Sequence, residues 1–340
     1  MTFLLLKTIG ICAGTALVIV FAGNRMSALA DNLADRSGLG EALTGTVFLG
    51  AATSLPGITA SVTAAHNGHA SLALSNAFGG IAAQTAFLAL ADLAYPRANL
   101  EHAAASLSNI LAGTLLISLL SVILLGTMGP EISFWGIHPI TPLLFAAYVL
   151  GLKLIRRSHE YPMWQPKMTP ETRPDIPEDL PPDSPALWKI WLQFAVSAFF
   201  VMGAGWLLTR ASETIVRETG ISESLVGAFL IAIITSLPEL VTTIAAVRRG
   251  ALTLAVGGVL GGNTFDILFG AMADAAYRSG SIYHAANQKE TILLTLSILM
   301  TSILIIGLLV RQKRGIANIG FESIIVLFIY GLGILMIGIG

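Results

Sequence analysis

The chain is a succession of apolar runs about 20 residues long, bounded by polar residues, glycine or proline. A helix needs about 20 apolar residues to cross a bilayer, where lipid offers the backbone no hydrogen-bonding partner. The sequence therefore predicts an all-α, polytopic membrane protein with ten transmembrane helices. These are expected near residues 4–28, 41–65, 70–93, 103–126, 136–155, 187–209, 223–247, 252–276, 289–310 and 318–339.

Composition excludes several classes of protein. Hydrophobic residues make up 54% of the chain and charged residues 11%, against about 25% charged residues in ordinary soluble domains. The formal net charge is −1, so the basic surface that nucleic-acid binding needs is missing and no nucleic-acid partner is expected. A lone cysteine, Cys12, rules out an internal disulfide. The chain shows no nucleophile–base pair and no cofactor motif, so we expect neither an enzyme nor a resident cofactor.

A proline-rich, charged segment at residues 157–186 divides the chain. Such a composition neither spans a membrane nor packs as a core, so we interpret it as a linker between five-helix units at 1–156 and 187–340. If the N-terminus is outside, the inward-facing segments hold fourteen of the 19 lysine and arginine residues. The positive-inside rule then predicts a cytoplasmic linker and both termini outside. We expect a protein of a bacterial-type inner (plasma) membrane, in contact with the lipid bilayer, and the sequence leaves its oligomeric state open.

The two halves contain copies of one unit. A shift of 182 residues aligns 38–95 with 220–277, and 20 of the 58 aligned positions are identical. The shared residues include a Thr-Ser-Leu-Pro segment, at 53–56 and at 235–238. Corresponding helices are five spans apart, an odd number, so the copies must cross the membrane in opposite directions. Inverted repeats of this kind are typical of secondary transporters, whose site lies near the midplane and at broken helices.

Two acidic residues fall near the middle of predicted helices. Glu239 lies in the 223–247 span and Asp266 in the 252–276 span, at comparable depth on either side of a turn at Gly250. A charged carboxylate at that depth costs at least ~2.5 kcal/mol, and no lysine or arginine lies at matching depth. We infer that the pair holds a transported cation, a proton or water; a structural, hydrogen-bonded carboxyl is the alternative. Carboxylate oxygens suit hard cations such as Ca²⁺ and Na⁺.

Neutral ligands are expected beside these acids. Pro56 and Pro238 each lack an N–H and clash with the carbonyl four residues earlier, which kinks the helix and releases carbonyls near Thr53 and Thr235. Hydroxyls of Thr53, Thr235 and the serines that follow them add further oxygens. Farther along, Asp92 and Asp274 lie at corresponding helix ends, where we expect solvation at the membrane interface.

These residues resemble the cation/Ca²⁺ exchanger superfamily, which contains Na⁺/Ca²⁺ and H⁺/Ca²⁺ exchangers. In that family two inverted alpha repeats each carry a Gly/Ala-Thr-Ser-Leu-Pro-Glu motif, followed later by an asparagine or aspartate. ITSLPE at 234–239 and GGNTFD at 261–266 match the second repeat, and Asp266 follows Glu239 by 27 residues. The resemblance covers nearly the whole chain. It implies that Glu239 and Asp266 bind the cation and that carbonyls of Thr235 and Thr53 assist.

The first repeat departs from this pattern. Gly57 stands where the family has its other key glutamate, and Gln84 stands where the second motif has asparagine or aspartate. Two carboxylates balance one divalent or two monovalent cations, whereas three Na⁺ would leave excess positive charge. We expect Gln84 to offer its carbonyl oxygen and water to fill the space beside Gly57.

The predicted cation site comprises Glu239, Asp266, Thr235, Ser236, Thr53, Ser54, Gln84, Asn263 and Asn76. The leading hypothesis is a secondary antiporter that exchanges Ca²⁺ for Na⁺ or H⁺ by alternating exposure of this site. A monovalent cation (Na⁺ or K⁺)/H⁺ antiporter is the second hypothesis, because the altered first repeat weakens the preference for a divalent ion. The third is a non-transporting, cation-sensing or structural relative, which the loss of the glutamate at Gly57 suggests.

Overall fold

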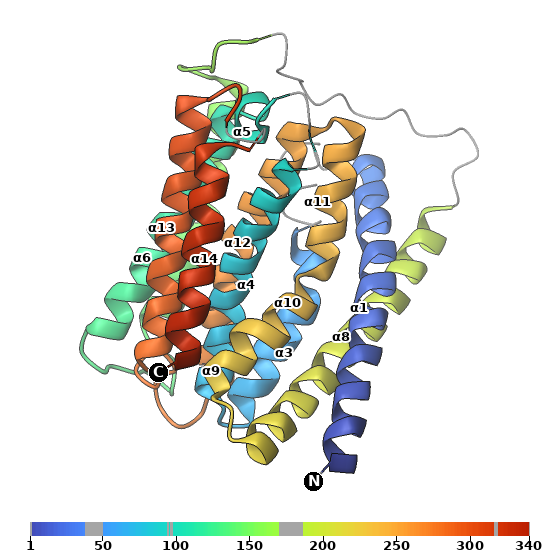
Figure 1. Ribbon diagram of the computed structural model, residues 1–340, viewed down its shortest axis with the longest axis vertical. Coiled ribbons are helices and arrows are strands. Elements are labelled where there is room, and N and C mark those ends of the chain that lie inside the picture. The colour runs from blue at the N-terminus through green and yellow to red at the C-terminus, as the bar shows by residue number, and fades with distance from the viewer. Residues whose placement is uncertain are drawn as a thin grey trace.

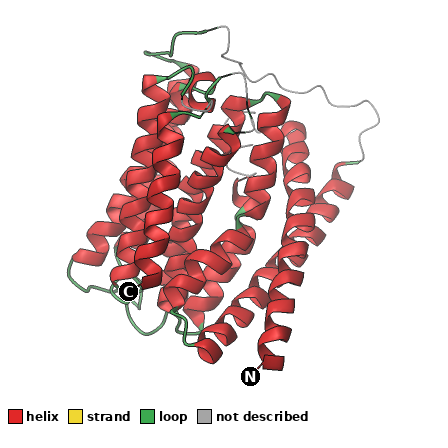
Figure 2. Ribbon diagram, viewed as in Figure 1, coloured by secondary structure: helices red, strands yellow, loops and turns green. Residues whose placement is uncertain are grey.

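The computed structural model describes residues 2–37, 50–93, 95, 98–169, 186–315 and 319–339. Within these ranges the regular structure is helical, and β-type pairing is limited to one isolated bridge between Phe134 and Ile137 (Figure 2). The helices are α1 (Thr2–Ser37), α3 (Leu55–His66), α4 (Ala70–Asp92), α5 (Leu100–Ala103), α6 (Leu107–Met128), α7 (Ile140–Glu160), α8 (Leu187–Thr219), α9 (Glu223–Leu225), the π-helix η1 (Val226–Ile231), α10 (Ala232–Thr235), α11 (Leu237–Arg249), α12 (Leu252–Ala276), α13 (Gln288–Val310) and α14 (Phe321–Ile339).

Seven helices of the described ranges are long and apolar enough to cross a membrane, or eight if the bent segment from Glu223 to Arg249 is one span. The prediction of an all-α, polytopic membrane protein is therefore confirmed. Two predicted spans fall outside this set. One is α7, whose last two turns carry Lys153, Arg156 and Arg157, and the other is the 41–65 run, of which residues 41–49 lie outside the described residues. The count of ten stays a prediction.

Several helices run past the ends that hydropathy predicts. α1 has 36 residues and α8 has 33, which at a rise of about 1.5 Å per residue makes both far longer than a hydrocarbon core of about 30 Å. The first residues of the predicted linker, up to Glu160, also belong to a helix, α7. An apolar run marks the part of a helix that meets lipid, whereas backbone hydrogen bonding continues into polar sequence.

The helices form a bundle in which α4 and α12 lie centrally (Figure 1). α1 and α8 lie side by side at one edge of the bundle, and α6, α13 and α14 lie on the other side (Figure 1). The membrane-spanning part of α4 is wholly buried, while only 22% of the corresponding window of α1 and of α8 is buried. α4 carries apolar residues on all its faces, is rich in alanine and glycine, and buries its few polar side chains as well, as expected of a helix packed on every side. The two acids of the predicted site lie on α11 and α12, and both of these helices pack against α4.

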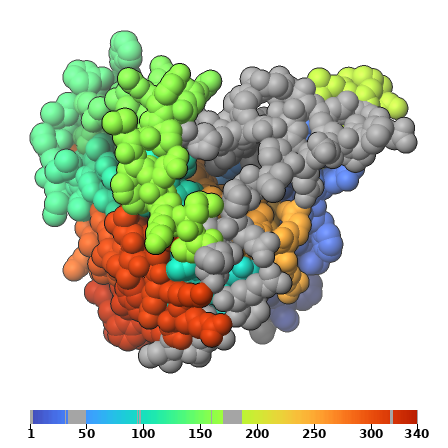
Figure 3. All heavy atoms as spheres, turned by 90° about the horizontal axis from the view of Figure 1, so that it is seen from above, coloured from blue at the N-terminus to red at the C-terminus, as the bar shows by residue number. Residues whose placement is uncertain are grey.

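The two chain ends lie at the same end of the bundle (Figure 1). Residues 161–169 run across the opposite end, against the C-terminal helices (Figure 3). Arg311 donates to the carbonyl of Lys167 at 2.5 Å, and a ring nitrogen of His102 lies 3.2 Å from the hydroxyl oxygen of Thr169. The start of the predicted linker is therefore attached to the bundle. The division of the chain at 156 and 187 stays a prediction, because residues 170–185 lie outside the described ranges.

Asp92 and Asp274 are fully buried, so the expectation that the membrane interface solvates them was wrong. Each carboxylate instead accepts hydrogen bonds from the backbone of two loops. The donors are the N–H groups of Leu100 (2.7 Å) and Gly320 (3.0 Å) for Asp92, and of Ile282 (3.1 Å) and His138 (2.8 Å) for Asp274. These donors are again related by 182 positions, Leu100 with Ile282 and His138 with Gly320. The sequence repeat thus extends to hydrogen bonds that fasten loops at both ends of the bundle.

Candidate cation site

One span of the second repeat is broken beside the predicted acid. The segment from Glu223 to Thr235 and α11 meet at Ser236 with a bend of 47°. Pro238 has no N–H, so the carbonyl of Ile234 cannot receive its usual intrahelical hydrogen bond. Glu239 lies in the first turn of α11, where the unpaired N–H groups of a helix start favour negative charge. The break therefore places a carboxylate at a helix N-terminus inside the protein.

The first repeat is interrupted at the equivalent place. Residues 50–53 are helical, Ser54 leaves the helix, and α3 begins at Leu55 with Pro56 in its first turn. The same two backbone hydrogen bonds flank both interruptions. In the first repeat the N–H of Ser54 donates to the carbonyl of Gly50 (2.9 Å) and that of Ile58 to the carbonyl of Ser54 (3.0 Å). In the second repeat the N–H of Ser236 donates to the carbonyl of Ala232 (3.1 Å) and that of Leu240 to the carbonyl of Ser236 (3.1 Å). Both copies thus present a Thr-Ser pair beside a broken helix.

Asp266 joins the two copies. This residue lies in α12 with 1% of its surface exposed, and the hydroxyl of Ser54 donates to its Oδ1. The side-chain amide of Gln84 donates to Asp266 Oδ2 at 2.6 Å and to Ser236 Oγ at 3.2 Å. Gln84 Oε1 is buried and has no hydrogen-bond partner among the described residues, so it is an acceptor available to a cation. Four of the nine predicted site residues form this one network.

Glu239 is 7% exposed and lies close enough to Asp266 for the two charges to interact. Its carboxyl is hydrogen-bonded to the side chain of Thr53, while its Oε2 is buried and has no hydrogen-bond partner in the part of the chain that the structure describes. The ion pairs found among the described residues include neither acid. Two neighbouring carboxyls without a basic partner repel each other strongly in a poorly solvated interior when both are ionised. A positive ion or protons between them relieves that repulsion.

Asn76 and Thr235 lie together beside this pair. The amide of Asn76 donates to Ser61 Oγ at 2.8 Å and to the carbonyl of Gly57 at 3.1 Å, and the Thr235 hydroxyl lies 3.4 Å from Asn76 Oδ1. Ser61 was not among the predicted site residues. The repeat could have identified Ser61 as a candidate, because the shift of 182 residues pairs it with Thr243, a second hydroxyl in an apolar segment.

The side-chain amide of Asn263 is hydrogen-bonded to α4 and is not part of the acids' hydrogen-bond network. Its amide donates to Thr85 Oγ1 at 3.1 Å and to the carbonyl of Ile81 at 3.4 Å, and its Oδ1 is buried without a partner within the described ranges. Thr85 was also missed by the sequence reasoning, although it directly follows Gln84. The structure therefore links eight predicted residues to the acids or to one another, and it places Asn263 beside them as part of the contact between α4 and α12.

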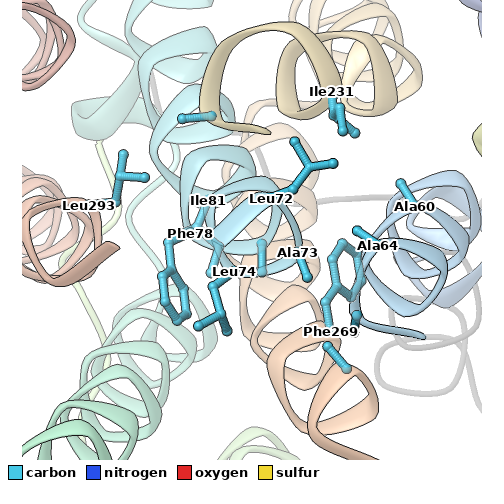
Figure 4. Packing of buried hydrophobic residues seen from close by; sticks show 14 of the residues in the cluster. Ala60, Ala64, Leu72, Ala73, Leu74, Phe78, Ile81, Ile231, Phe269 and Leu293 are labelled. Atoms are coloured by element: carbon cyan, nitrogen blue, oxygen red, sulfur yellow. The ribbon is translucent and has the colours of Figure 1, made fainter. Parts of the chain in front are cut away.

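The expectation that water fills the space beside Gly57 was wrong. A Cβ atom at Gly57 would lie 2.5 Å from Cε2 of Phe269 and 3.0 Å from its Cζ, so an aromatic ring already occupies this place. Figure 4 shows Phe269 projecting from α12 toward α3, beside Ala64. Phe269 follows Asp266 by three residues, so both side chains leave α12 on neighbouring parts of one face. No local pattern indicates this contact, because it joins residues 212 positions apart.

The donor atoms fit a hard cation better than a transition metal. No group of three or more histidine, cysteine, aspartate or glutamate side chains among the described residues is arranged to hold a metal ion. The candidate site instead combines two carboxyls with hydroxyl, amide and carbonyl oxygens. Oxygen ligands of this kind suit Ca²⁺ and Na⁺, whereas transition metals such as Zn²⁺ and Cu²⁺ prefer the sulfur of cysteine and the nitrogen of histidine.

The fold and this site define a polytopic membrane protein of the ion-transporter class. The sodium/calcium exchanger protein family matches residues 7–152 and 189–338, so the chain belongs to this family. The resemblance to the cation/Ca²⁺ exchanger superfamily is thereby confirmed. Members of this family are exchangers, which are transporters, and the expectation that this protein is not an enzyme stays a prediction.

Curated relatives are similar over parts of the chain. The putative antiporter CaxA of Alkalimonas amylolytica is 31% identical over 130 residues, which are 37% of this chain and 40% of that protein. The sodium/calcium exchanger MaX1 of Methanosarcina acetivorans is 39% identical over 69 residues, 20% of this chain and 19% of that protein. The matched segments thus span less than half of these relatives.

Solved structures show the same fold over nearly the whole chain. The crystal structure of the H⁺/Ca²⁺ exchanger CAX has a TM-score of 0.68 at 13% identity, covering 98% of this chain and 86% of that one. The sodium-calcium exchanger NCX_Mj has a TM-score of 0.62 at 16% identity, covering 97% of this chain and 99% of that one. At such low identity the likeness establishes the fold alone.

Proposed function

We propose that the protein is a secondary-active antiporter that exchanges Ca²⁺ for Na⁺ or H⁺ at the site containing Glu239 and Asp266. The observation that carries this proposal is the pair itself: two buried, neighbouring carboxyls with no basic ion-pair partner in the described part of the chain and with one oxygen, Glu239 Oε2, lacking a hydrogen bond there. Holding such a pair in hydrocarbon is costly unless cations or protons occupy it. Membership of the exchanger family supports the same conclusion.

In this proposal the nine predicted residues act together on the ion. Glu239 and Asp266 supply charge, Thr53, Ser54, Thr235 and Ser236 supply hydroxyl or carbonyl oxygens, and Gln84, Asn76 and Asn263 supply amide oxygens. The bonds from Ser54 and Gln84 to Asp266 run between the two repeats. A change in how the repeats pack on each other therefore rearranges the site and exposes it to one side of the membrane or the other.

The direct test replaces Glu239 by Gln in protein reconstituted into liposomes that are loaded with one ion and diluted into the other. We expect Glu239→Gln to abolish exchange, because the variant loses half of the negative charge at the site. Glu131→Gln is the matched control, since Glu131 is an exposed loop residue far along the chain from the site. Full ion flux in Glu239→Gln would remove this residue from the mechanism.

A monovalent cation/H⁺ antiporter is the second candidate function. The glycine at position 57 and the neutral Gln84 favour it, since they leave fewer charges for a divalent ion than two complete repeats would. Uptake of radiolabelled Ca²⁺ and Na⁺, measured side by side across a pH gradient, separates the two candidates. Proton-coupled Na⁺ or K⁺ flux without Ca²⁺ flux would establish the second. Cation-dependent thermal stabilisation without any flux would establish a non-transporting, cation-sensing relative.

We further propose that the protein lies in a bacterial-type inner membrane with the 157–186 segment in the cytoplasm and both termini outside. The excess of lysine and arginine in the segments on the linker side supports this orientation. Labelling of single cysteines introduced at Glu131 and at Tyr161 in intact cells, in a variant whose Cys12 is replaced by Ala, tests it. Residue 131 must react with a membrane-impermeant reagent and residue 161 must not.

A further inference from the structure

We propose that Phe269 limits the cation site to two negative charges and that exchange by this protein is therefore electroneutral. The proposal rests on the proposed antiport function and adds to it the number of charges that are moved. Under it, one divalent cation exchanges for two monovalent cations or two protons.

The first step concerns the place where a third carboxylate would be. The shift of 182 residues that relates the repeats pairs Gly57 with Glu239. A side chain at position 57 would therefore enter the site from the α3 side, opposite Glu239. That place is taken by the ring of Phe269, 2.5 Å from where a Cβ atom would be, and Phe269 is itself 4% exposed.

The second step is that α3 is held against this ring. The amide of Asn76 on α4 donates to the carbonyl of Gly57 at 3.1 Å, which fixes the backbone at this residue. On another side α8 packs closely, since a Cβ atom at Gly205 would lie 2.6 Å from the carbonyl oxygen of Pro56. With α3 fastened by both neighbours, residue 57 cannot retreat from Phe269 to make room for a side chain.

The third step counts the charges. Gln84 and Asp266 are equivalent positions of the two repeats, and Gln84 is neutral and donates its amide to Asp266. Among its described residues the first repeat thus brings no charge to the site, and the second brings those of Glu239 and Asp266. One divalent or two monovalent ions balance the pair. Any further cation leaves net positive charge in a medium of low dielectric constant, where an unbalanced charge is expensive.

The first experiment measures charge movement during exchange by the reconstituted protein. A voltage-sensitive dye should show no change of potential while Ca²⁺ moves against Na⁺ or H⁺. Adding valinomycin with equal K⁺ on both sides should leave the rate of exchange unchanged. Exchange that generates a potential, or that valinomycin accelerates several-fold, would overturn the charge proposal and leave the antiport function standing. Absence of flux with all cations would instead overturn the proposed function.

The second experiment tests Phe269 directly. In Gly57→Glu/Phe269→Ala the ring is removed and a third carboxylate is introduced, so we expect exchange to become electrogenic. In Gly57→Glu alone the side chain meets the ring, so we expect severely reduced flux. A double variant that transports without charge movement would overturn the proposal.

Thermal unfolding gives a readout that does not depend on transport. Gly57→Ala should lower the unfolding temperature of the wild type, and this loss should largely disappear in the Phe269→Ala background. Gly203→Ala on α8 is the control, because no atom of the described residues lies within 4 Å of a Cβ atom there; it should behave alike in both backgrounds. An equal loss from Gly57→Ala with and without the ring would show that Phe269 does not fill this place.

Discussion

The structure predicts a clear loss of stability when Gly79 is replaced by alanine. It lies in α4 where this helix packs against η1, and a Cβ atom there would lie 2.6 Å from the Cα of Ala228 and 3.0 Å from its carbonyl oxygen. Both neighbouring atoms are backbone, so neither can turn aside as a side chain does. Gly79→Ala therefore forces the two helices apart, and overpacking of this kind costs about 1–3 kcal/mol.

A matched substitution isolates the cost of the close approach. Gly10 lies in α1, and a Cβ atom there would have no atom of the described chain within 4 Å, so Gly10→Ala has only the gain in helix propensity, about 1 kcal/mol. Gly79→Ala has the same gain, and the difference between the two variants should thus be about 1–3 kcal/mol. Thermal unfolding of both purified proteins in detergent measures this difference. If Gly79→Ala is as stable as Gly10→Ala, the tight contact between α4 and η1 is not present in the protein.

Three further predictions concern other buried polar groups. Asp274→Ala removes the acceptor of two buried loop N–H groups and should destabilise the protein by about 1–3 kcal/mol for each of them, which thermal unfolding checks. Burial, followed by the nearby Asp92 and Glu322 carboxylates, raises the pKa of Glu101 well above its ordinary value. The wild type should therefore lose stability as pH rises above the ordinary glutamate range, and Glu101→Gln should weaken this dependence in unfolding scans from about pH 5 to about pH 9. Gln84→Leu leaves Asp266 Oδ2 without its amide donor and should lower the exchange rate at least several-fold; an unchanged rate in ion-flux assays would contradict the role of Gln84.

Some features of the site followed from the sequence because they are local. Pro56 and Pro238 interrupt their helices through the missing N–H, a covalent property of proline, and both interruptions are found in the structure. Glu239 and Asp266 are acidic residues within apolar segments, where a charge is costly unless it has a binding partner, so the sequence already indicated a shared buried site. The repeat added strength to both inferences, because equal spacing in two copies gives equal geometry.

Other features depend on contacts between distant segments. Asp92 and Asp274 look like interfacial residues in the sequence, yet both are buried by loops that fold back over the helix ends. The ends of α1 and α8 also differ from the prediction, because hydropathy detects lipid contact and not helical hydrogen bonding.

The amino-acid sequence by itself determined the all-helical membrane fold, the duplicated unit and the identity of the two buried acids. Each of these features is local, because it depends on the length of an apolar run, on the repeated spacing of residues or on the residue type at one position. Only the tertiary structure decided that an aromatic ring, and not water, lies beside Gly57. The physical reason is packing: which side chain fills the space left by a glycine depends on the helix that lies opposite, and no local pattern encodes that neighbour.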